Sequence, residues 1–381
     1  MKAAILNDSH FGKGNDAEEI IAQQRLFFEK IFFPYLIKND IKEIFHLGDL
    51  LDNRKAISPK TLYFMRKILL EPIRENGIHM TIIPGNHDVF YKNTHTISGL
   101  KETLGYFTNN VTIIQNNPVT LSYANDAKIG WIPWVNKENE QSISRFLREQ
   151  TDADVILGHF EFGDFYMDQY TKSRHGTLNW ADGSFDKFQL VLTGHFHHKS
   201  QKGNIHYLGS QYEMSWSDHN DPKYFHVLEK NASSKEYTLT SVRNPYTLFN
   251  EIDYRGDETS IPDPDEVSNK FIRVNCHDRT NQYEFDRFIE KLETFNPYKV
   301  QIRDYSILSI DESLLVTEGS PTEDDGMSLL ESISWKDTMG FATHFIDAKV
   351  DLDKSHLDKE ILHQVFRDIY KEAESIDQQM I

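Results

Sequence analysis

The stretch Lys2-Ala3-Ala4-Ile5-Leu6-Asn7-Asp8-Ser9-His10 decides the fold of this chain. It joins a short apolar run to an acid and a histidine that stand two residues apart. Such a run is typical of a buried strand, and a buried strand presents the residues that follow it at its carboxyl edge. We therefore expect the Asp8 and His10 side chains to lie on a loop at one edge of a sheet.

Four later stretches have the same build, an apolar run followed at once by Asp, Asn or His. They are Phe45-His-Leu-Gly-Asp49, Ile82-Ile-Pro-Gly-Asn-His-Asp88, Val155-Ile-Leu-Gly-His159 and Val191-Leu-Thr-Gly-His-Phe-His197. Taken singly, each has a plain alternative: residues 85–88 read as a turn, and residues 195–198 as a solvated histidine tract. Their joint occurrence, each directly after a strand, favours a two-metal site at one sheet edge.

Composition limits the classes of protein that the chain can belong to. With 381 residues it is long enough for two domains. The single cysteine, Cys276, excludes an intramolecular disulfide and fits a reducing cytoplasm. Acids among the first 20 residues argue against a secretory signal, and no apolar run approaches 18 residues, so we expect no membrane contact.

The net charge of −18, from 41 basic and 59 acidic residues, argues against an autonomous nucleic-acid binder. It does not exclude a nucleic-acid enzyme. Bound divalent cations would neutralise the metal site locally, and a partner subunit would supply the basic groove.

Residues 1–245 predict a mixed α/β domain with two packed sheets flanked by helices. Within it we expect a helix around Phe28 to Leu36 that kinks or ends early at Pro34, and a second helix beginning at Ser58-Pro59. Residues 160–188 are interpreted as a long surface loop rich in aromatic residues.

Asn244-Pro245 marks a domain boundary. Residues 246–310 predict a small capping unit made of a strand, a helix and a strand, without a cluster of metal-ligand residues. Residues 311–326 are an acidic linker, and residues 327–381 are helical in pattern.

The motifs together resemble those of the calcineurin-like metallophosphoesterases. They are Asp8-x-His10, Gly48-Asp49-x-x-Asp52, Gly85-Asn86-His87-Asp88, Gly158-His159 and Gly194-His195-x-His197. The variant Asp8-Ser-His-Phe-Gly12, the capping unit and the helical tail make the chain similar to the SbcD-type DNA repair and recombination exonuclease subunits, above all to those of bacteriophages. The motif resemblance covers about residues 1–230, and beyond residue 246 it rests on architecture.

The resemblance implies two sets of metal ligands. The first is Asp8, His10, Asp49 and His197, and the second is Asp49, Asn86, His159 and His195, with Asp49 shared. Oxygen donors mixed with imidazole nitrogens suit two Mn²⁺ ions, with Mg²⁺ as a weaker substitute.

Catalytic roles are also implied beside the ligands. His87 is the candidate for steadying transition-state charge or protonating the leaving oxygen, and Asp88 either orients His87 or caps the turn. Asp52 departs from relatives that carry a second histidine there, which puts a two-histidine mechanism in doubt. Asp52, Arg54 and His175 are candidate substrate contacts, although Arg54 reads equally as a solvated loop residue and His175 as a surface histidine.

The implied function is that of a manganese-dependent DNA nuclease, acting as an exonuclease on duplex ends and an endonuclease on single strands. It would be the nuclease subunit of a complex with an SMC-like ABC ATPase in double-strand-break processing and recombination. The ATPase would bind residues 327–381, unless that apolar stripe folds back on its own domain. A homodimer formed through the early helices would complete a two-plus-two assembly in the cytoplasm, that of the host if the chain is encoded by a phage.

Two other classes stay open. A phosphoprotein phosphatase or small-molecule phosphodiesterase would use the same fold, but such phosphatases resemble Gly-Asp-x-x-Asp-Arg-Gly, whereas this chain has Asn53 before Arg54. A non-catalytic scaffold would have lost metal ligands, and every expected ligand position here holds a competent residue.

Overall fold

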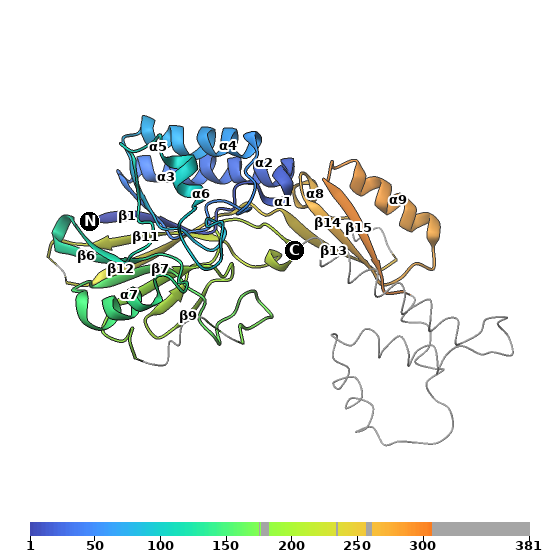
Figure 1. The fold of residues 1–381 in the computed structure, drawn as a ribbon. Helices are drawn as coiled ribbons and strands as arrows, with labels where there is room; N and C mark the ends of the chain where they lie inside the picture. Colours follow the sequence, from blue (N-terminus) through green and yellow to red (C-terminus); the bar gives the residue numbers. More distant parts are fainter. Residues whose placement is uncertain (175, 177–182, 234, 257–260, 307–381) are drawn as a thin grey trace, which may run out of the picture. The chain divides into compact units, whose positions relative to one another are not determined.

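The computed structural model describes residues 1–174, 176, 183–233, 235–256 and 261–306. The described strands form two six-stranded sheets and one three-stranded sheet (Figure 1). The predicted pair of mixed sheets flanked by helices is confirmed.

The first sheet carries three of the five ligand-bearing strands. Its order is β12 (Tyr237–Arg243), β11 (Tyr224–Lys230), β1 (Lys2–Leu6), β2 (Glu43–His46), β3 (His79–Ile82) and β4 (Val111–Ile113). Strands β1 to β4 run parallel, with Leu6 paired to His46 and His46 to Ile82. The loops that follow these strands therefore leave the sheet at the same edge.

The second sheet carries the other two ligand-bearing strands. Its order is β5 (Val119–Tyr123), β6 (Ala127–Ile132), β7 (Val155–His159), β8 (Leu190–Gly194), β10 (Ile205–Tyr207) and β9 (Ser200–Lys202). Strands β7 and β8 are parallel, and His159 is paired with Gly194. The two sheets pack face to face through a fully buried layer that includes Ile5, Phe45, Trp131 and Leu157.

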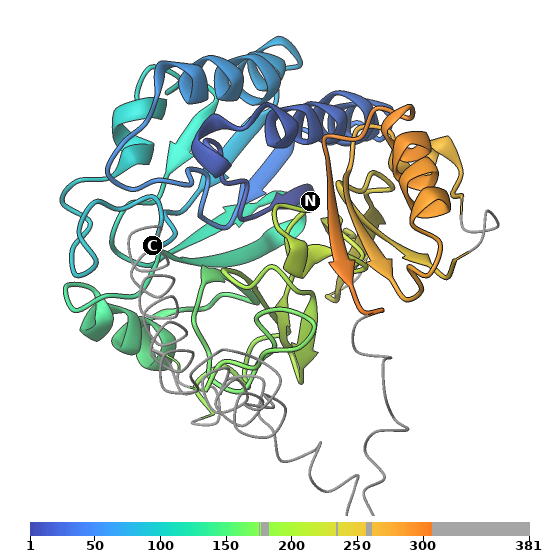
Figure 2. The ribbon, with the colours of Figure 1, turned by 90° about the vertical axis from the view of Figure 1, so that its right-hand side faces the viewer.

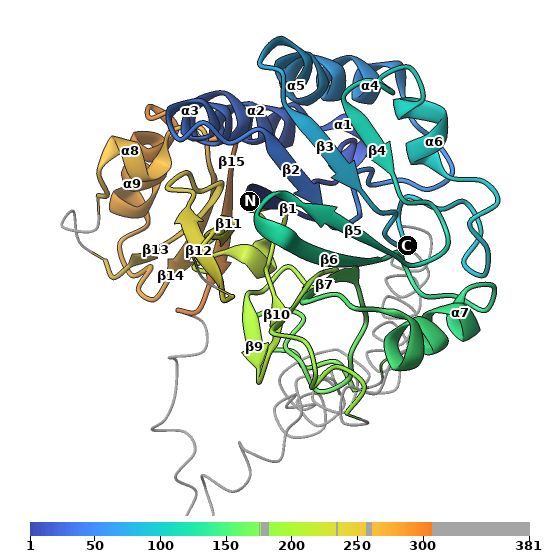
Figure 3. The same cartoon turned by 90° about the vertical axis from the view of Figure 1, so that its left-hand side faces the viewer.

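Helices cover the outer face of each sheet (Figure 3). Over the first sheet lie α2 (Glu18–Leu26), the π-helical η1 (Phe27–Phe32), α3 (Phe33–Lys38), α4 (Pro59–Met65), the π-helical η2 (Arg66–Leu70), α5 (Glu71–Glu75) and α6 (Gly99–Leu104). Over the second lie α7 (Glu140–Arg145) and the π-helical η4 (Phe146–Gln150). Ser58 caps α4 as predicted, since its hydroxyl accepts a hydrogen bond from the Thr61 amide at 2.9 Å.

The helical path through Pro34 does not end early. It continues to Lys38, and the π-helical turn η1 ends at Phe32, two residues before the proline. Pro34 has no N–H to donate within this continuous helical path, and the π-helical turn just before it accommodates the missing hydrogen bond. The expected early end is therefore wrong, and a widened turn takes the place of a break.

In its described part the segment 160–188 has no helix or strand and is exposed at Tyr170, as expected of a surface loop, but it also contributes to the core. Its five phenylalanines are buried, with at most 3% of each exposed: Phe160, Phe162, Phe165, Phe185 and Phe188. They pack with Phe146 of η4 and Tyr207 of β10 on the outer face of the second sheet. Aromatic residues without a regular spacing gave no strand or helix pattern, although burying them contributes to a core.

The capping unit holds one strand more than predicted. Strands β13 (Phe249–Tyr254), β14 (Phe271–Cys276) and β15 (Lys299–Asp304) are parallel, in that order. The short α8 (Pro264–Val267) precedes β14, and α9 (Gln282–Glu293) follows it and packs on the sheet (Figure 2). The extra strand, β13, does not alternate strictly, because two polar residues, Asn250 and Glu251, follow Phe249.

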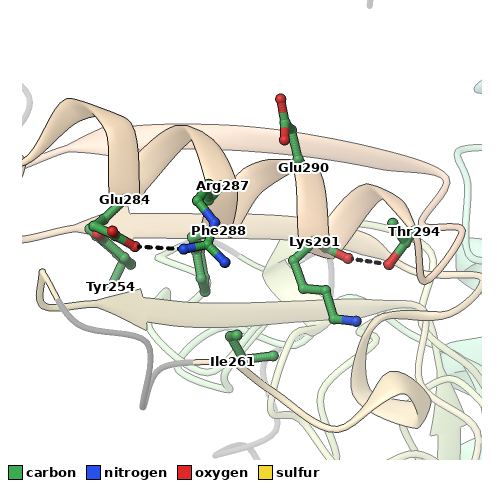
Figure 4. Close-up of a pocket in the computed structure, with 8 residues that line it drawn as sticks. All are labelled: Tyr254, Ile261, Glu284, Arg287, Phe288, Glu290, Lys291 and Thr294. Carbon is green, nitrogen blue, oxygen red and sulfur yellow. Dashed lines mark hydrogen bonds and ion pairs between the residues drawn. The ribbon is translucent and has the colours of Figure 1, made fainter.

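A hollow on the capping unit of about 440 Å³ lies between α9 and the loop that contains Ile261 (Figure 4). Arg287 pairs there with Glu284 at 3.6 Å. In the described part of the chain, the side chains arranged to hold a metal all come from residues 8 to 197 and none from the capping unit. This hollow therefore has no part in the site described below.

The capping unit joins the core through backbone hydrogen bonds to a buried acid. The Glu213 carboxylate accepts from the amides of Leu248 at 2.6 Å and Phe249 at 3.0 Å. Ile20 of α2 packs against the same two residues. The predicted acidic linker, residues 311–326, and helical tail, residues 327–381, lie outside the described residues. No helix in the described part of the chain is long and apolar enough to cross a membrane.

Candidate metal centre

Five strand ends bring their polar residues to one place. Among the described residues, three groups of side chains offer ligand atoms that lie within 4.8 Å of one another: Asp8, His10 and His197; His10, Asp49 and His87; and Asp49, His159 and His195. The groups share His10 and Asp49, so they form one continuous cluster. The structure therefore brings together the metal-ligand residues predicted from the sequence.

The first donor set surrounds the Asp8 carboxylate. His10 Nε2 and His197 Nε2 face each other at 3.2 Å. Asp8 is fully buried and accepts from the His195 amide at 3.0 Å and from Asn7 Nδ2 at 2.5 Å. Burial lowers the pKa of His197 to about 3, so its ring is neutral and offers a lone pair. A carboxylate beside two imidazole nitrogens is a donor set for a divalent cation.

The second donor set is organised by Asn86. Its Oδ1 lies 2.9 Å from His195 Nδ1 and 3.1 Å from His159 Nε2. His159 Nδ1 donates to the Leu47 carbonyl at 2.8 Å, which fixes the tautomer and turns Nε2 toward the cluster. Its pKa is raised to about 9: burial opposes this, but the Asp49 charge outweighs burial. A buried imidazole that is drawn to its charged form shows that the cluster favours positive charge.

Asp49 lies between the two sets. Its Oδ2 is 3.4 Å from His159 Nε2 and 3.9 Å from His10 Nε2, and its Oδ1 accepts from the His87 amide at 2.8 Å. Burial opposes ionisation of Asp49, yet the neighbouring histidines hold its pKa well below the usual range. The buried carboxylate is therefore ionised and faces both sets.

The residues present fit a pair of divalent metal ions. The donors are carboxylate and amide oxygens and imidazole nitrogens, and the one cysteine, Cys276, is buried in the capping unit. Oxygen and nitrogen donors without thiolate suit hard or borderline cations. Burial opposes protonation of His10 and His159, but nearby carboxylates, including those of Asp8 and Asp49, raise the pKa of both rings. A bound cation would supply positive charge at the same place.

His87 lies beside the ligands and is held by backbone. Its Nδ1 donates to the Asp52 carbonyl at 2.5 Å, and its ring meets that of His10 edge-on with centroids 4.9 Å apart. Because a carbonyl only accepts, Nδ1 carries the proton, and Nε2 is the nitrogen available to a substrate.

The Asp88 carboxylate binds backbone amides of two ligand loops. It accepts from the amides of Gly85 at 2.9 Å, Leu51 at 3.0 Å and Leu50 at 3.3 Å. These bonds tie the loop after β2 to the loop after β3. Burial, together with the Asp49 charge, raises the pKa of Asp88 to about 7.

The three candidate substrate contacts fall in different places. The Asp52 carboxylate lies behind a ligand, with Oδ1 at 3.2 Å from His10 Nδ1. Arg54 is half-buried on the loop after β2. His175 lies outside the described residues.

A buried clamp on Ser9 was not predicted. The Ser9 carbonyl accepts from Gln24 Nε2 at 3.0 Å and from the Tyr212 hydroxyl. The Ser9 hydroxyl meets His46 Nε2 at 2.9 Å and Gln211 Nε2 at 3.1 Å. These partners come from α2, the end of β2 and the segment after β10, and of them His46 alone lies in one of the five ligand-bearing stretches.

Lys223 supports another ligand, His197. It is buried and donates to Asp218 at 2.6 Å, Asp221 at 2.9 Å and the His197 carbonyl at 3.0 Å. The backbone that carries His197 is therefore fixed by a fully paired ammonium group.

Comparison with known proteins adds a family. The model of the calcineurin-like phosphoesterase family matches residues 1–199. Exonuclease subunit 1 of Enterobacteria phage T4 is 32% identical over 260 residues, which cover 67% of this chain and 74% of that protein. A dimetal phosphatase from Danio rerio aligns with a TM-score of 0.39 and 9% identity, over 65% of this chain and 97% of that one. A purple acid phosphatase from yellow lupin aligns with a TM-score of 0.36 and 11% identity, over 60% and 49%.

Proposed function

The chain belongs to the calcineurin-like phosphoesterase family, and from this premise we propose that it is a manganese-dependent DNA nuclease subunit. Its class, a phosphoester hydrolase with a cluster of metal ligands, follows from the family. The proposal of a metal-dependent nuclease rests on two donor sets that share Asp49, with His87 directly beside them. The relative from phage T4 is named an exonuclease subunit, which supports DNA as the substrate.

We assign one cation to Asp8, His10, Asp49 and His197, and the other to Asp49, Asn86, His159 and His195. When bound, such a pair activates water and stabilises charge on the attacked phosphate. The mixture of imidazole with oxygen donors favours Mn²⁺ over Mg²⁺.

The protein's own groups complete the reaction. His87, fixed through Nδ1 by the Asp52 carbonyl, presents Nε2 to the leaving oxygen, either to donate a proton or to stabilise its charge. His159, fixed by the Leu47 carbonyl, keeps its ring directed at the cluster without rearranging. The Asp88 clamp holds the two loops that supply Asp49 and His87 in register.

We further propose that the nuclease works with partners. The net charge of −18 leaves DNA attraction to a partner, and an SMC-like ABC ATPase bound through residues 327–381 would supply it. The capping unit would steer duplex ends toward the centre. Ile37 of α3 is 56% exposed and Leu26 of α2 37% exposed, which supports the early helices as a homodimer surface. Undiminished ATPase binding by a chain truncated at residue 320 would rule out the tail as the dock.

The deciding experiment compares substrates. Linear duplex DNA, a single-stranded circle and para-nitrophenyl phosphate are incubated with Mn²⁺, Mg²⁺ or EDTA, with and without the ATPase. We expect Mn²⁺-dependent loss of both DNAs and little release of nitrophenol from the monoester. Efficient hydrolysis of the monoester with both DNAs left intact would instead make the chain a phosphatase.

A further inference from the structure

A lysine stands where the metal centre opens to solvent. Lys13 Nζ lies 3.3 Å from Asp52 Oδ1, and the same oxygen lies 3.2 Å from His10 Nδ1. The exposed fraction of the side chains rises along this row, from 3% for His10 through 20% for Asp52 to 34% for Lys13. Asp52 therefore connects a buried ligand to a cation that solvent reaches.

The backbone that carries Lys13 is held in place. Its amide donates to the His10 carbonyl at 3.1 Å. Asp16, three residues on, accepts from Ser58 and from Thr61 Oγ1 at the start of α4, and its carbonyl accepts from Lys60 Nζ at 2.8 Å. The loop that places Lys13 is therefore tied to both the ligand loop and a helix.

Charge makes this position useful. The centre gathers Asp8, Asp49 and Asp52, which repel a polyanion unless cations offset them. In the described part of the chain, Lys13 and Lys223 contact residues of the centre. Lys223 is 3% exposed, and its ammonium group is directed at Asp218, Asp221 and the His197 carbonyl. Lys13 reaches solvent, and its ammonium group, which has three donors, forms an ion pair with Asp52.

We propose that Lys13 binds a phosphate of the DNA strand next to the one that is cleaved, and that Asp52 is a positioning residue for it. This inference rests on the proposed nuclease function. A lysine binds phosphate as a point charge without reading bases, so the contact would serve any sequence. Asp52 would then hold two groups at once, the ring of His10 and the ammonium group of Lys13.

The chain offers a matched control for the test. Lys2 is 37% exposed and pairs with one carboxylate, that of Glu229, at 3.7 Å. It begins β1, whereas the ligand loop follows the opposite end of that strand. Lys2→Met and Lys13→Met therefore remove the same charge at similar exposure. Lys2 lies far from the centre, whereas Lys13 lies next to it.

Binding of a fluorescent single-stranded oligonucleotide is measured by anisotropy over a range of salt, with Ca²⁺ replacing Mn²⁺. We expect Lys13→Met to weaken binding about tenfold and to reduce the slope of log K against log salt by about 0.7, the value for one phosphate contact on a single strand. Lys13→Arg should keep most of the slope, and Lys2→Met should match the wild type. In cleavage assays with Mn²⁺, Lys13→Met should lose more kcat/KM on DNA than on bis(para-nitrophenyl) phosphate.

Two outcomes would overturn the inference, and they are distinguishable. If the wild type cleaves DNA while Lys13→Met and Lys2→Met give equal salt slopes, Lys13 makes no phosphate contact and the nuclease function stands. If the wild type neither binds nor cleaves DNA even with the ATPase present, the proposed function and the inference fail together. Thermal melting of Lys13→Met and of a second variant, Lys13→Gln, checks that both are folded.

Discussion

Replacing Asp49 by Asn should disable both metal positions at once. The substitution keeps the shape of the side chain and the Oδ1 acceptor for the His87 amide, at 2.8 Å in the native protein. It removes the negative charge that lies 3.4 Å from His159 Nε2 and 3.9 Å from His10 Nε2. The loops should stay in place, so the change tests charge and ligation rather than folding.

The size of the effect can be bounded from a neighbouring residue. Asp52 touches a ligand ring from behind, and removing such an outer partner costs about 10- to 100-fold in metal affinity. Asp49 faces both donor sets directly, so Asp49→Asn should exceed about 100-fold, or about 2.7 kcal/mol, for each cation. Asp52→Asn should instead weaken one cation, the one assigned to His10, and leave the other nearly unchanged.

Calorimetric titration with Mn²⁺ measures the number of bound ions and the affinity of each, and cleavage of DNA is followed in parallel. The wild type should bind two ions, Asp52→Asn two ions of unequal affinity, and Asp49→Asn none at micromolar metal. Turnover by Asp49→Asn should fall below a few per cent. Two ions bound by Asp49→Asn with native affinity, or substantial turnover, would show that Asp49 is not shared between the cations.

Three further substitutions test other parts of the centre. His87→Ser should retain Mn²⁺ but cut DNA roughly 10²–10⁴-fold more slowly, whereas loss of Mn²⁺ in elemental analysis would make His87 a ligand. Tyr212→Phe removes a donor to the Ser9 carbonyl, so the free energy of unfolding in urea should fall by about 1–2 kcal/mol and Mn²⁺ should bind more weakly. Native values of both would show that the clamp on Ser9 does not support the centre. Burial raises the pKa of Glu213 to about 7 from its ordinary 4.5, so the folded state keeps this proton and stability falls as pH rises between those values. The free energy of unfolding of Glu213→Gln should therefore rise by up to about 3 kcal/mol relative to that of the wild type on going from pH 5 to pH 8. The same difference between variant and wild type at both pH values would contradict this.

The sheet edge and its ligand types were predictable because they are local in sequence. An apolar run such as Val155–His159 shows both its burial and the residue that ends it within five positions. Parallel pairing then brings such ends together without further information. The additional strand β13 was missed because Asn250 and Glu251 interrupt the apolar pattern of Phe249–Tyr254.

Contacts between distant segments could not be predicted in the same way. Tyr212 meets Ser9 across 203 positions, and Gln24 meets Tyr212 across 188. Neither glutamine nor tyrosine is unusual where it stands, so no composition or period marks these residues. Their role depends on where the finished fold places them, which a single sequence does not reveal.

The backbone of the ligand loops shows why such contacts are needed. Asp8, His10, Asp49 and His195 all have positive φ, at 49°, 43°, 53° and 88°. This conformation costs a residue with a side chain roughly 1–2 kcal/mol. Glycine adopts it without strain but has no side chain to bind a metal. Aspartate and histidine are among the few types that both tolerate positive φ and bind cations, so strain and ligation select the same residues. The surrounding structure must hold these loops against the strain, and the clamp on Ser9 lies between two of the strained residues. The donor sets are therefore shaped by the fold itself, and a cation arriving at the centre need not create them.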